Sequence, residues 1–413
     1  MRAVGLVFAL VMAAAPAAAQ DTAPSSQWIQ LALGGGEEAR AVTQAATCPA
    51  IAVDGNALPM SERAAPDANF PLRVCSAPIP AAAKTASISG VALPLMPKNP
   101  ERILVFGDTG CRIKGNTIQN CNDPKLWPFP QIAQQAAKLK PDLVIHVGDY
   151  LYRESACPDN DPRCAGTPHG DNWASWNADF FAPAAPLLAA SPWVIVRGNH
   201  EDCERAGPGW LRLLGPTAFD PAEPCVPHLA PYTVPIGAVN LIVLDNANAP
   251  DTSIDNDQLP AYRSDFAEIP KLAKAPVWLA MHRPIWGAVT GPLGLRVGGN
   301  RTMIAALPPH ALDKVSLMLA GHIHTFEILN YGGHTPSQIV AGFGGDALDA
   351  TPLDLAGADL SGMTVHDGLS IPGFGFMMMT KAKAGWAIDV YRVDGSIERK
   401  CRFQNYRLDC PAQ

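Results

Sequence analysis

A series of short apolar runs, each ending in a polar cluster, constrains the fold of this chain most strongly. Six runs rich in Val, Ile and Leu recur after Arg102, at residues 103–106, 143–147, 193–196, 241–244, 277–281 and 315–319. Such runs are typical of strands that are buried on both faces. Helix-like stretches at 130–140, 173–190 and 257–272 lie between them. This alternation predicts an α/β fold, and strand-like segments within 371–393 predict a closing hairpin.

The polar clusters that follow five of these runs contain residue types that bind metals. They read GDTG at 107–110, GDYLY at 148–152, GNHE at 198–201, MHRP at 281–284 and GHIH at 321–324. Ligands of open α/β sheets bind beyond the carboxyl ends of the strands. The donors in these clusters are oxygens and imidazoles, which suit Fe, Mn or Zn: Asp108, Asp149, Tyr152, Asn199, His282, His322 and His324. Any one cluster is an ordinary loop start, but five in order predict a shared metal centre.

This order of motifs resembles the calcineurin-like metallophosphoesterase superfamily, and in particular its purple acid phosphatase-like branch. The resemblance covers approximately residues 102–330, and Tyr152 stands where that branch places an iron-binding tyrosine. It implies a sandwich of two mixed β-sheets flanked by helices. It also implies a metal-dependent phosphoric ester hydrolase of the acid phosphatase type, in which a metal-bound hydroxide attacks a phosphate monoester.

The resemblance also assigns the ligands to two metal ions. The first, expected to be Fe(III), takes Asp108, Tyr152 and His324. The second, expected to be Fe(II), Zn(II) or Mn(II), takes Asn199, His282 and His322, and Asp149 bridges the two ions. A hard trivalent ion prefers anionic oxygen and can keep a phenol ionised although its ordinary pKa is about 10.

Catalytic and substrate-binding roles follow from the same resemblance. His200 is expected to assist the leaving group, with Glu201 orienting His200 or supporting the site, although His200 could have a purely structural role. Many relatives have a His at the position of Gly110, and plant-type relatives have further His residues after the counterpart of His282. Here an arginine follows His282, so the expected phosphate clamps are Arg283, Arg296 and Arg301, with solvated surface arginines as the alternative.

The N-terminus and the cysteines both indicate export. Residues 1–19 have a basic start, an apolar stretch and a small-residue cleavage site, which predict a signal peptide rather than a retained anchor. We find no other apolar segment of about 20 residues, so no membrane span is expected in the mature chain. Ten cysteines predict disulfides in the periplasm or outside the cell. Neighbouring cysteines are expected to pair, although spacing leaves other connectivities open: Cys48–Cys75, Cys111–Cys121, Cys157–Cys164, Cys203–Cys225 and Cys401–Cys410.

Composition separates two regions of the chain. Residues 20–100 are rich in Ala and Pro and are expected to form a β-rich extension or small module, before a metallophosphoesterase domain at 101–413. The net charge of −7 and the lack of a basic run argue against nucleic acid as a partner, which leaves a small phosphate ester. The alternatives are a phosphodiesterase or nucleotide-cleaving enzyme, a non-catalytic metal- or phosphate-binding protein, and a redox-active diiron protein. The sequence does not indicate an oligomeric state.

Overall fold

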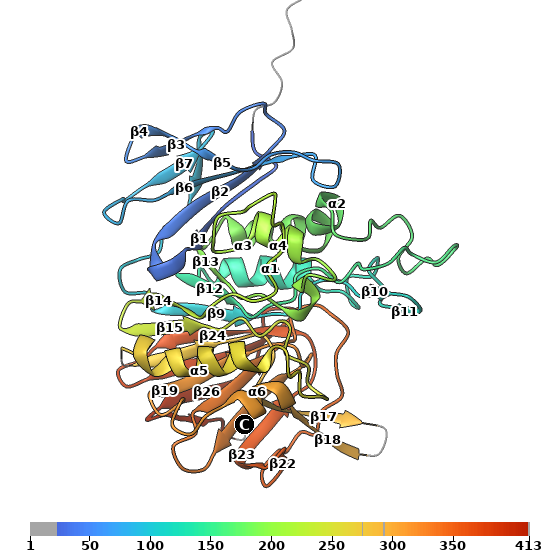
Figure 1. The fold of residues 1–413 in the computed structure, drawn as a ribbon, viewed down its shortest axis with the longest axis vertical. Helices are drawn as coiled ribbons and strands as arrows, with labels where there is room; N and C mark the ends of the chain where they lie inside the picture. The colour runs from blue at the N-terminus through green and yellow to red at the C-terminus, as the bar shows by residue number, and fades with distance from the viewer. Residues whose placement is uncertain (1–22, 275, 292–293, 412–413) are drawn as a thin grey trace, which may run out of the picture.

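Two large β-sheets pack face to face with helices on their outer faces (Figure 1). The computed structural model describes residues 23–411 except 275 and 292–293, so the predicted signal peptide lies outside the described residues. Consecutive residues of one strand show why both faces are buried. Ile103 packs between the sheets and Leu104 packs under the helices. The predicted sandwich of two mixed sheets flanked by helices is confirmed.

The first sheet has eleven strands in the order β27-β26-β25-β24-β9-β12-β13-β1-β2-β6-β5. Its parallel centre is β9 (Arg102–Phe106), β12 (Leu143–His146) and β13 (Trp193–Ile195). The C-terminal strands continue the sheet outward from β9 in chain order: β24 (Gly375–Lys381), β25 (Trp386–Arg392), β26 (Ile397–Gln404) and β27 (Arg407–Asp409). The N-terminal strands extend the sheet outward from β13, in the spatial order β1 (Ser26–Leu31), β2 (Glu37–Thr43), β6 (Arg73–Pro78) and β5 (Ser61–Ala64). The hairpin expected within 371–393 is formed by β24 and β25.

The second sheet has eight strands, four of them parallel. These are β15 (Val239–Val243), β16 (Val277–Ala280), β19 (Val315–Ala320) and β21 (Ser337–Ala341). Antiparallel strands complete it: β14 (Tyr232–Ile236), β20 (Phe326–Tyr331), β23 (Met363–Ile371) and β22 (Asp359–Leu360). The loops that carry the predicted ligands follow five of these parallel strands, β9, β12, β13, β16 and β19.

Helices cover the outer faces of both sheets. The first sheet is covered by α1 (Phe129–Lys138), α2 (Trp173–Trp176), α3 (Ala182–Leu188) and α4 (Gly207–Leu213). The second sheet is covered by α5 (Leu259–Leu272) and α6 (Arg301–Ala306). The helix expected at 173–190 consists of α2 and α3 joined by a π-helical turn, Asn177–Phe181. Within the described residues, no helix is long and apolar enough to cross a membrane.

Smaller elements decorate the sandwich. A four-stranded sheet in the N-terminal region contains β3 (Ala50–Val53), β4 (Asn56–Pro59), β7 (Ala86–Ile88) and β8 (Val91–Leu93). Two hairpins project from loops: β10 (Ile113–Lys114) with β11 (Thr117–Ile118), and β17 (Trp286–Gly291) with β18 (Gly294–Gly299). Single 3-10 turns lie at Leu33–Gly35 and Asn199–Glu201. All ten cysteines are joined in disulfides: Cys48–Cys75, Cys111–Cys121, Cys157–Cys164, Cys203–Cys225 and Cys401–Cys410.

Candidate metal centre

Three of the predicted ligands have an unusual backbone conformation. Asp108, Asp149 and His322 have φ angles of 58°, 61° and 71°. This left-handed region is costly for residues with a side chain, and such strain persists only where the surroundings enforce it. Here the loops restrain one another, because the Asp108 N–H donates to Gly148 O at 2.9 Å and the His322 N–H donates to Asp108 Oδ2 at 3.0 Å. The strand ends are therefore fixed in a geometry that points these side chains inward.

One half of the site converges on the hydroxyl of Tyr152. This oxygen lies 3.0 Å from Asp108 Oδ1, 2.8 Å from Asp149 Oδ2 and 3.0 Å from His324 Nε2. The side chains come from the ends of β9, β12 and β19, and all four are buried. The His324 ring is fixed from behind by a contact of 2.8 Å between its Nδ1 and Ala347 O. Four donor atoms from distant segments thus face one point.

The other half is built around His282. Its Nε2 lies 3.0 Å from Asn199 Oδ1 and 3.1 Å from Asp149 Oδ2, while its Nδ1 lies 2.8 Å from Val147 O. His322 completes this half, since Asp149, His282 and His322 offer ligand atoms that all lie within 4.8 Å of one another. Asp149 Oδ2 therefore contacts both halves. The structure brings all seven predicted ligands together.

The electrostatics of the donor set fit cations. Burial alone would lower the pKa of His282, but Asp149 and Asp108 outweigh it and raise that pKa to about 9. Burial would likewise lower the pKa of His324, but Asp346 and Asp108 raise it to about 10. Buried carboxylates thus favour positive charge at the centre. Because carboxylate, amide, phenol and imidazole donors suit Fe, Mn and Zn, the residues present fit two such ions.

Of the two roles expected for Glu201, its contacts fit support of the site. Its side chain does not orient His200; instead its carboxylate accepts four backbone N–H groups. Oε1 accepts from Tyr150 at 2.8 Å and Leu151 at 3.1 Å, and Oε2 accepts from Asp149 and Gly198, both at 3.1 Å. The fully buried carboxylate therefore joins the loop that carries Asp149 to the loop that carries Asn199.

Glu154, which the sequence analysis did not single out, is the group that contacts His200. His200 Nδ1 lies 2.6 Å from Glu154 Oε1, and its Nε2 lies 3.9 Å from Asp149 Oδ2. Burial would raise the pKa of Glu154, but the contact with His200 and the nearby Lys114 and Arg205 lower it to about 2. The ring of His200 also packs 3.8 Å from that of Tyr152. The imidazole is thereby held with Nε2 facing the centre.

The three predicted phosphate clamps have different positions. Arg283 adjoins the centre, with Nη1 at 3.2 Å from His322 Nε2 and an ion pair with Asp251, whose Oδ2 lies 2.8 Å from the same His322 atom. Arg301 is exposed at the start of α6 and donates to Thr252 O at 3.1 Å. Arg296 lies in β18, and its side chain is outside the described part.

A second Arg–Asp pair, Arg112 and Asp346, adjoins His324 and was not predicted from the sequence. Arg112 Nε donates to Asp346 Oδ2 at 3.0 Å, and Asp346 Oδ2 lies 3.3 Å from His324 Nδ1. Burial would lower the pKa of Arg112, but Asp346 holds it above its usual range. Each histidine of the 321–324 motif therefore contacts one Arg–Asp pair. Arg112 and Asp346 are far apart in sequence, so no local pattern could have linked them.

Gly110 stands where many relatives have a histidine, and the structure gives a steric reason for this difference. A Cβ atom on Gly110 would lie 2.8 Å from Cδ2 of the Tyr152 ring and 2.9 Å from Asp179 Oδ2. The ring of Tyr152 therefore occupies the space beside Gly110, and the position cannot take the histidine that many relatives have there.

The fold and the donor set together define a metallophosphoesterase. The sequence family of calcineurin-like phosphoesterases matches residues 101–326, and the chain belongs to this family. It is accordingly a metal-dependent phosphoric ester hydrolase that acts on phosphate esters. A search of curated proteins finds no match.

Solved structures with the same fold share little sequence with this chain. A purple acid phosphatase isolated from seeds of yellow lupin (Lupinus luteus) is 14% identical, with a TM-score of 0.56, over 92% of this chain and 74% of that one. A structure of PhoD is 12% identical, with a TM-score of 0.52, over 96% of this chain and 94% of that one. These similarities extend beyond the family match at both ends and show that nearly the whole chain shares the fold.

Proposed function

We propose that this protein is an exported phosphomonoesterase whose centre holds two metal ions. The observation that carries the proposal is the convergence of Asp108, Asp149 and His324 on the Tyr152 hydroxyl. Burial and the two carboxylates raise the pKa of Tyr152 well above its ordinary value, so only a strongly charged cation would keep it ionised. This supports Fe(III) in the first half, with Fe(II), Zn(II) or Mn(II) in the second.

The two ions would supply Lewis acidity to activate water and neutralise phosphate. The chain's own residues do the rest. His200, held at Nδ1 by Glu154, can carry a proton at Nε2 and deliver it to the leaving alkoxide. Arg283, held by Asp251 beside His322, can contact a phosphate oxygen. Glu201 fixes the loop that carries Asp149 against the loop that carries Asn199.

Export and domain organisation belong to the same proposal. Five disulfides favour an oxidising compartment, either the periplasm or the exterior. We assign residues 1–19 to a signal peptide, residues 20–100 to a β-rich N-terminal extension and residues 101–413 to the metallophosphoesterase domain. The family match, which begins at residue 101, supports the last boundary.

Metal analysis and paired substrates test the proposal. Protein purified from its export compartment is expected to contain about two metal ions per chain and to hydrolyse p-nitrophenyl phosphate faster than its bis-ester. A preference for the bis-ester would identify a phosphodiesterase instead. Metal-loaded protein without turnover of either ester would identify a binding protein and overturn the catalytic assignment.

A further inference from the structure

Arg112 reaches the half of the centre that contains Tyr152. Its Cζ lies 5.3 Å from the centroid of the Tyr152 ring, and its Nη2 lies 3.5 Å from His324 Nδ1. Although these neighbours are buried, 28% of the Arg112 side chain is exposed. The guanidinium therefore lies beside the predicted ligands and is partly open to solvent.

Asp346 orients this guanidinium and leaves part of it free. Arg112 Nε lies 3.0 Å from Asp346 Oδ2 and 3.3 Å from Oδ1, and Nη2 also pairs with this fully buried carboxylate. In the described part of the chain, Nη1 has no hydrogen-bond partner. Because the guanidinium is planar, fixing Nε and Nη2 also fixes the direction of the Nη1 donors.

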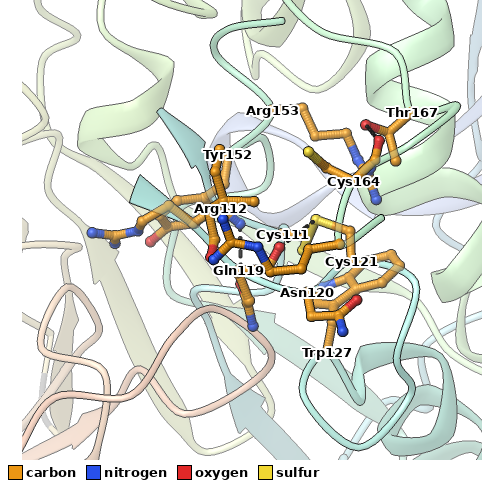
Figure 2. The surroundings of a disulfide bond; sticks show 12 residues. Cys111, Arg112, Gln119, Asn120, Cys121, Trp127, Tyr152, Arg153, Cys164 and Thr167 are labelled. Atoms are coloured by element: carbon orange, nitrogen blue, oxygen red, sulfur yellow. Dashed lines mark hydrogen bonds between the residues drawn. A yellow bond between two sulfur atoms is a disulfide. The ribbon is translucent and has the colours of Figure 1, made fainter. Parts of the chain in front are cut away.

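A disulfide-closed loop, residues 111–121, presents Arg112. The Cys111–Cys121 bond closes this loop, and Figure 2 shows Arg112 and Gln119 beside it, near Tyr152. Gln119 Oε1 accepts from the Arg112 N–H at 3.0 Å, and Gln119 Nε2 donates to Gly345 O at 2.8 Å. The loop is thus joined to the residue that precedes Asp346. Its rigidity lowers the entropic cost of holding Arg112 in place.

Arg112 has a counterpart at the other half of the centre. Arg283 pairs with Asp251 beside His322, as Arg112 pairs with Asp346 beside His324. We propose that Arg112 binds a terminal phosphate oxygen through Nη1, opposite Arg283, and that it favours the dianion of a monoester over a diester. A diester has one fewer ionisable oxygen and gains less from a second guanidinium. This inference rests on the proposed function.

Binding of inorganic phosphate tests this role directly. Calorimetric titration of the metal-loaded protein is expected to show about 10- to 100-fold weaker binding for Arg112→Ala, which loses a charge-assisted hydrogen bond. Arg112→Lys is expected to bind more tightly than Arg112→Ala but less tightly than the wild type. Lysine keeps the positive charge but lacks the planar arrangement of guanidinium donors. Arg163→Ala is the matched control, because Arg163 forms an exposed ion pair with Asp161 in another disulfide loop.

Kinetics and metal content distinguish a phosphate-binding role of Arg112 from a structural role. For Arg112→Ala, kcat/KM is expected to fall at least about tenfold for p-nitrophenyl phosphate and less for its bis-ester. Unchanged phosphate affinity in Arg112→Ala, with or without a loss of metal or thermal stability, would show a structural role and overturn the inference. If the wild-type protein hydrolyses no ester, the proposed function fails, while the phosphate titration still decides the role of Arg112.

Discussion

At the scale of single residues, Tyr152 offers the sharpest test of the centre. Tyr152→Phe removes the oxygen on which three other donors converge, without changing the ring that packs on His200. We expect iron affinity to fall by about tenfold or more. Removing a residue that only hydrogen-bonds to a metal ligand already lowers metal affinity by about tenfold, and Tyr152 is expected to be a ligand itself. Elemental analysis and the visible absorption of an iron–phenolate pair measure the loss.

Tyr150 provides the matched control. It is also buried, but its hydroxyl donates to Val196 O at 2.9 Å and its ring stacks on His146, away from the donor set. Tyr150→Phe should keep iron and colour while losing about 1 kcal/mol of stability. If Tyr152→Phe retains colour and iron as Tyr150→Phe does, assignment to the purple branch is wrong.

Short sequence motifs predicted the metal ligands, but not the residues that hold those ligands in place. The seven predicted ligands could be found because each follows an apolar run in a short local motif. Asp251, Asp346 and Glu154 have no such motif; their roles arise from contacts that only folding creates, such as that of Asp346 with Arg112, 234 residues away. Glu201 carries a recognisable motif, yet its buried acceptor role depends on backbone geometry.

At the scale of elements, the loop at 111–121 should couple stability to ligand binding. Replacing Cys111 and Cys121 by Ser is expected to destabilise the protein by about 3 kcal/mol, as for other short closed loops. It should also weaken phosphate binding several-fold, because Arg112 loses its fixed position. Chemical unfolding and phosphate titration measure the two effects.

The disulfide Cys401–Cys410 is the control for loop size. Its sequence separation is 9, against 10 for Cys111–Cys121, but it lies by β26, away from the centre. Its double Ser variant should lose similar stability and keep phosphate affinity. Equal loss of phosphate affinity in both variants would contradict a specific role for the first loop.

A buried carboxyl in β20 predicts a pH dependence of stability. Burial, with a smaller contribution from Asp349, raises the pKa of Glu327 from 4.5 to about 8. Between these pH values the folded protein keeps a proton that the unfolded chain releases, so stability falls as pH rises. Glu327→Gln removes this term, and its stability should exceed that of the wild type by roughly 2–4 kcal/mol at pH 8 but not at pH 4.

Urea unfolding at several pH values measures this difference. Glu223→Gln, a change at an exposed position, should follow the wild-type profile. A constant difference between Glu327→Gln and the wild type across this range would show that Glu327 does not titrate as proposed.

Glu327 also shows why strand β20 was not predicted from the sequence. Continuous apolar runs revealed six strands: β9, β12, β13, β15, β16 and β19. In contrast, β20 contains buried Glu327 and Asn330 and lacks such a run. Asn330 is accommodated because its side chain contacts Ser337, Leu408 and Asp367. Partners this distant in sequence decide whether a polar residue can be buried, so hydropathy alone does not reveal the strand.

At the scale of the whole molecule, the N-terminal region is expected to be indispensable to the sandwich. Trp28 in β1 is buried 5.1 Å from the ring of Phe181, and Arg40 in β2 donates to Leu213 O and Gly215 O at 2.7 and 2.9 Å. A chain that begins at residue 101 would leave β13 as an open edge and expose this core. Its melting temperature should fall by more than roughly 10 °C, or it should aggregate.

Calorimetry and light scattering test this expectation. A chain that begins at Ala23 retains every described contact of β1 and β2, and should melt like the mature protein. A stable, monomeric protein beginning at residue 101 would show instead that the N-terminal strands are an independent attachment.

The position of β9 has a consequence for how the protein matures. This strand, which leads into Asp108, lies between β12 and β24, and β24 ends only at Lys381. Because a ribosome releases the N-terminal part first, the strand has no partner on one flank until almost the entire polypeptide has been made. Ions taken up early would meet a partial set of donors, so metal loading should follow completion of the chain. The supply of metal ions where the protein folds should then set how much active enzyme accumulates.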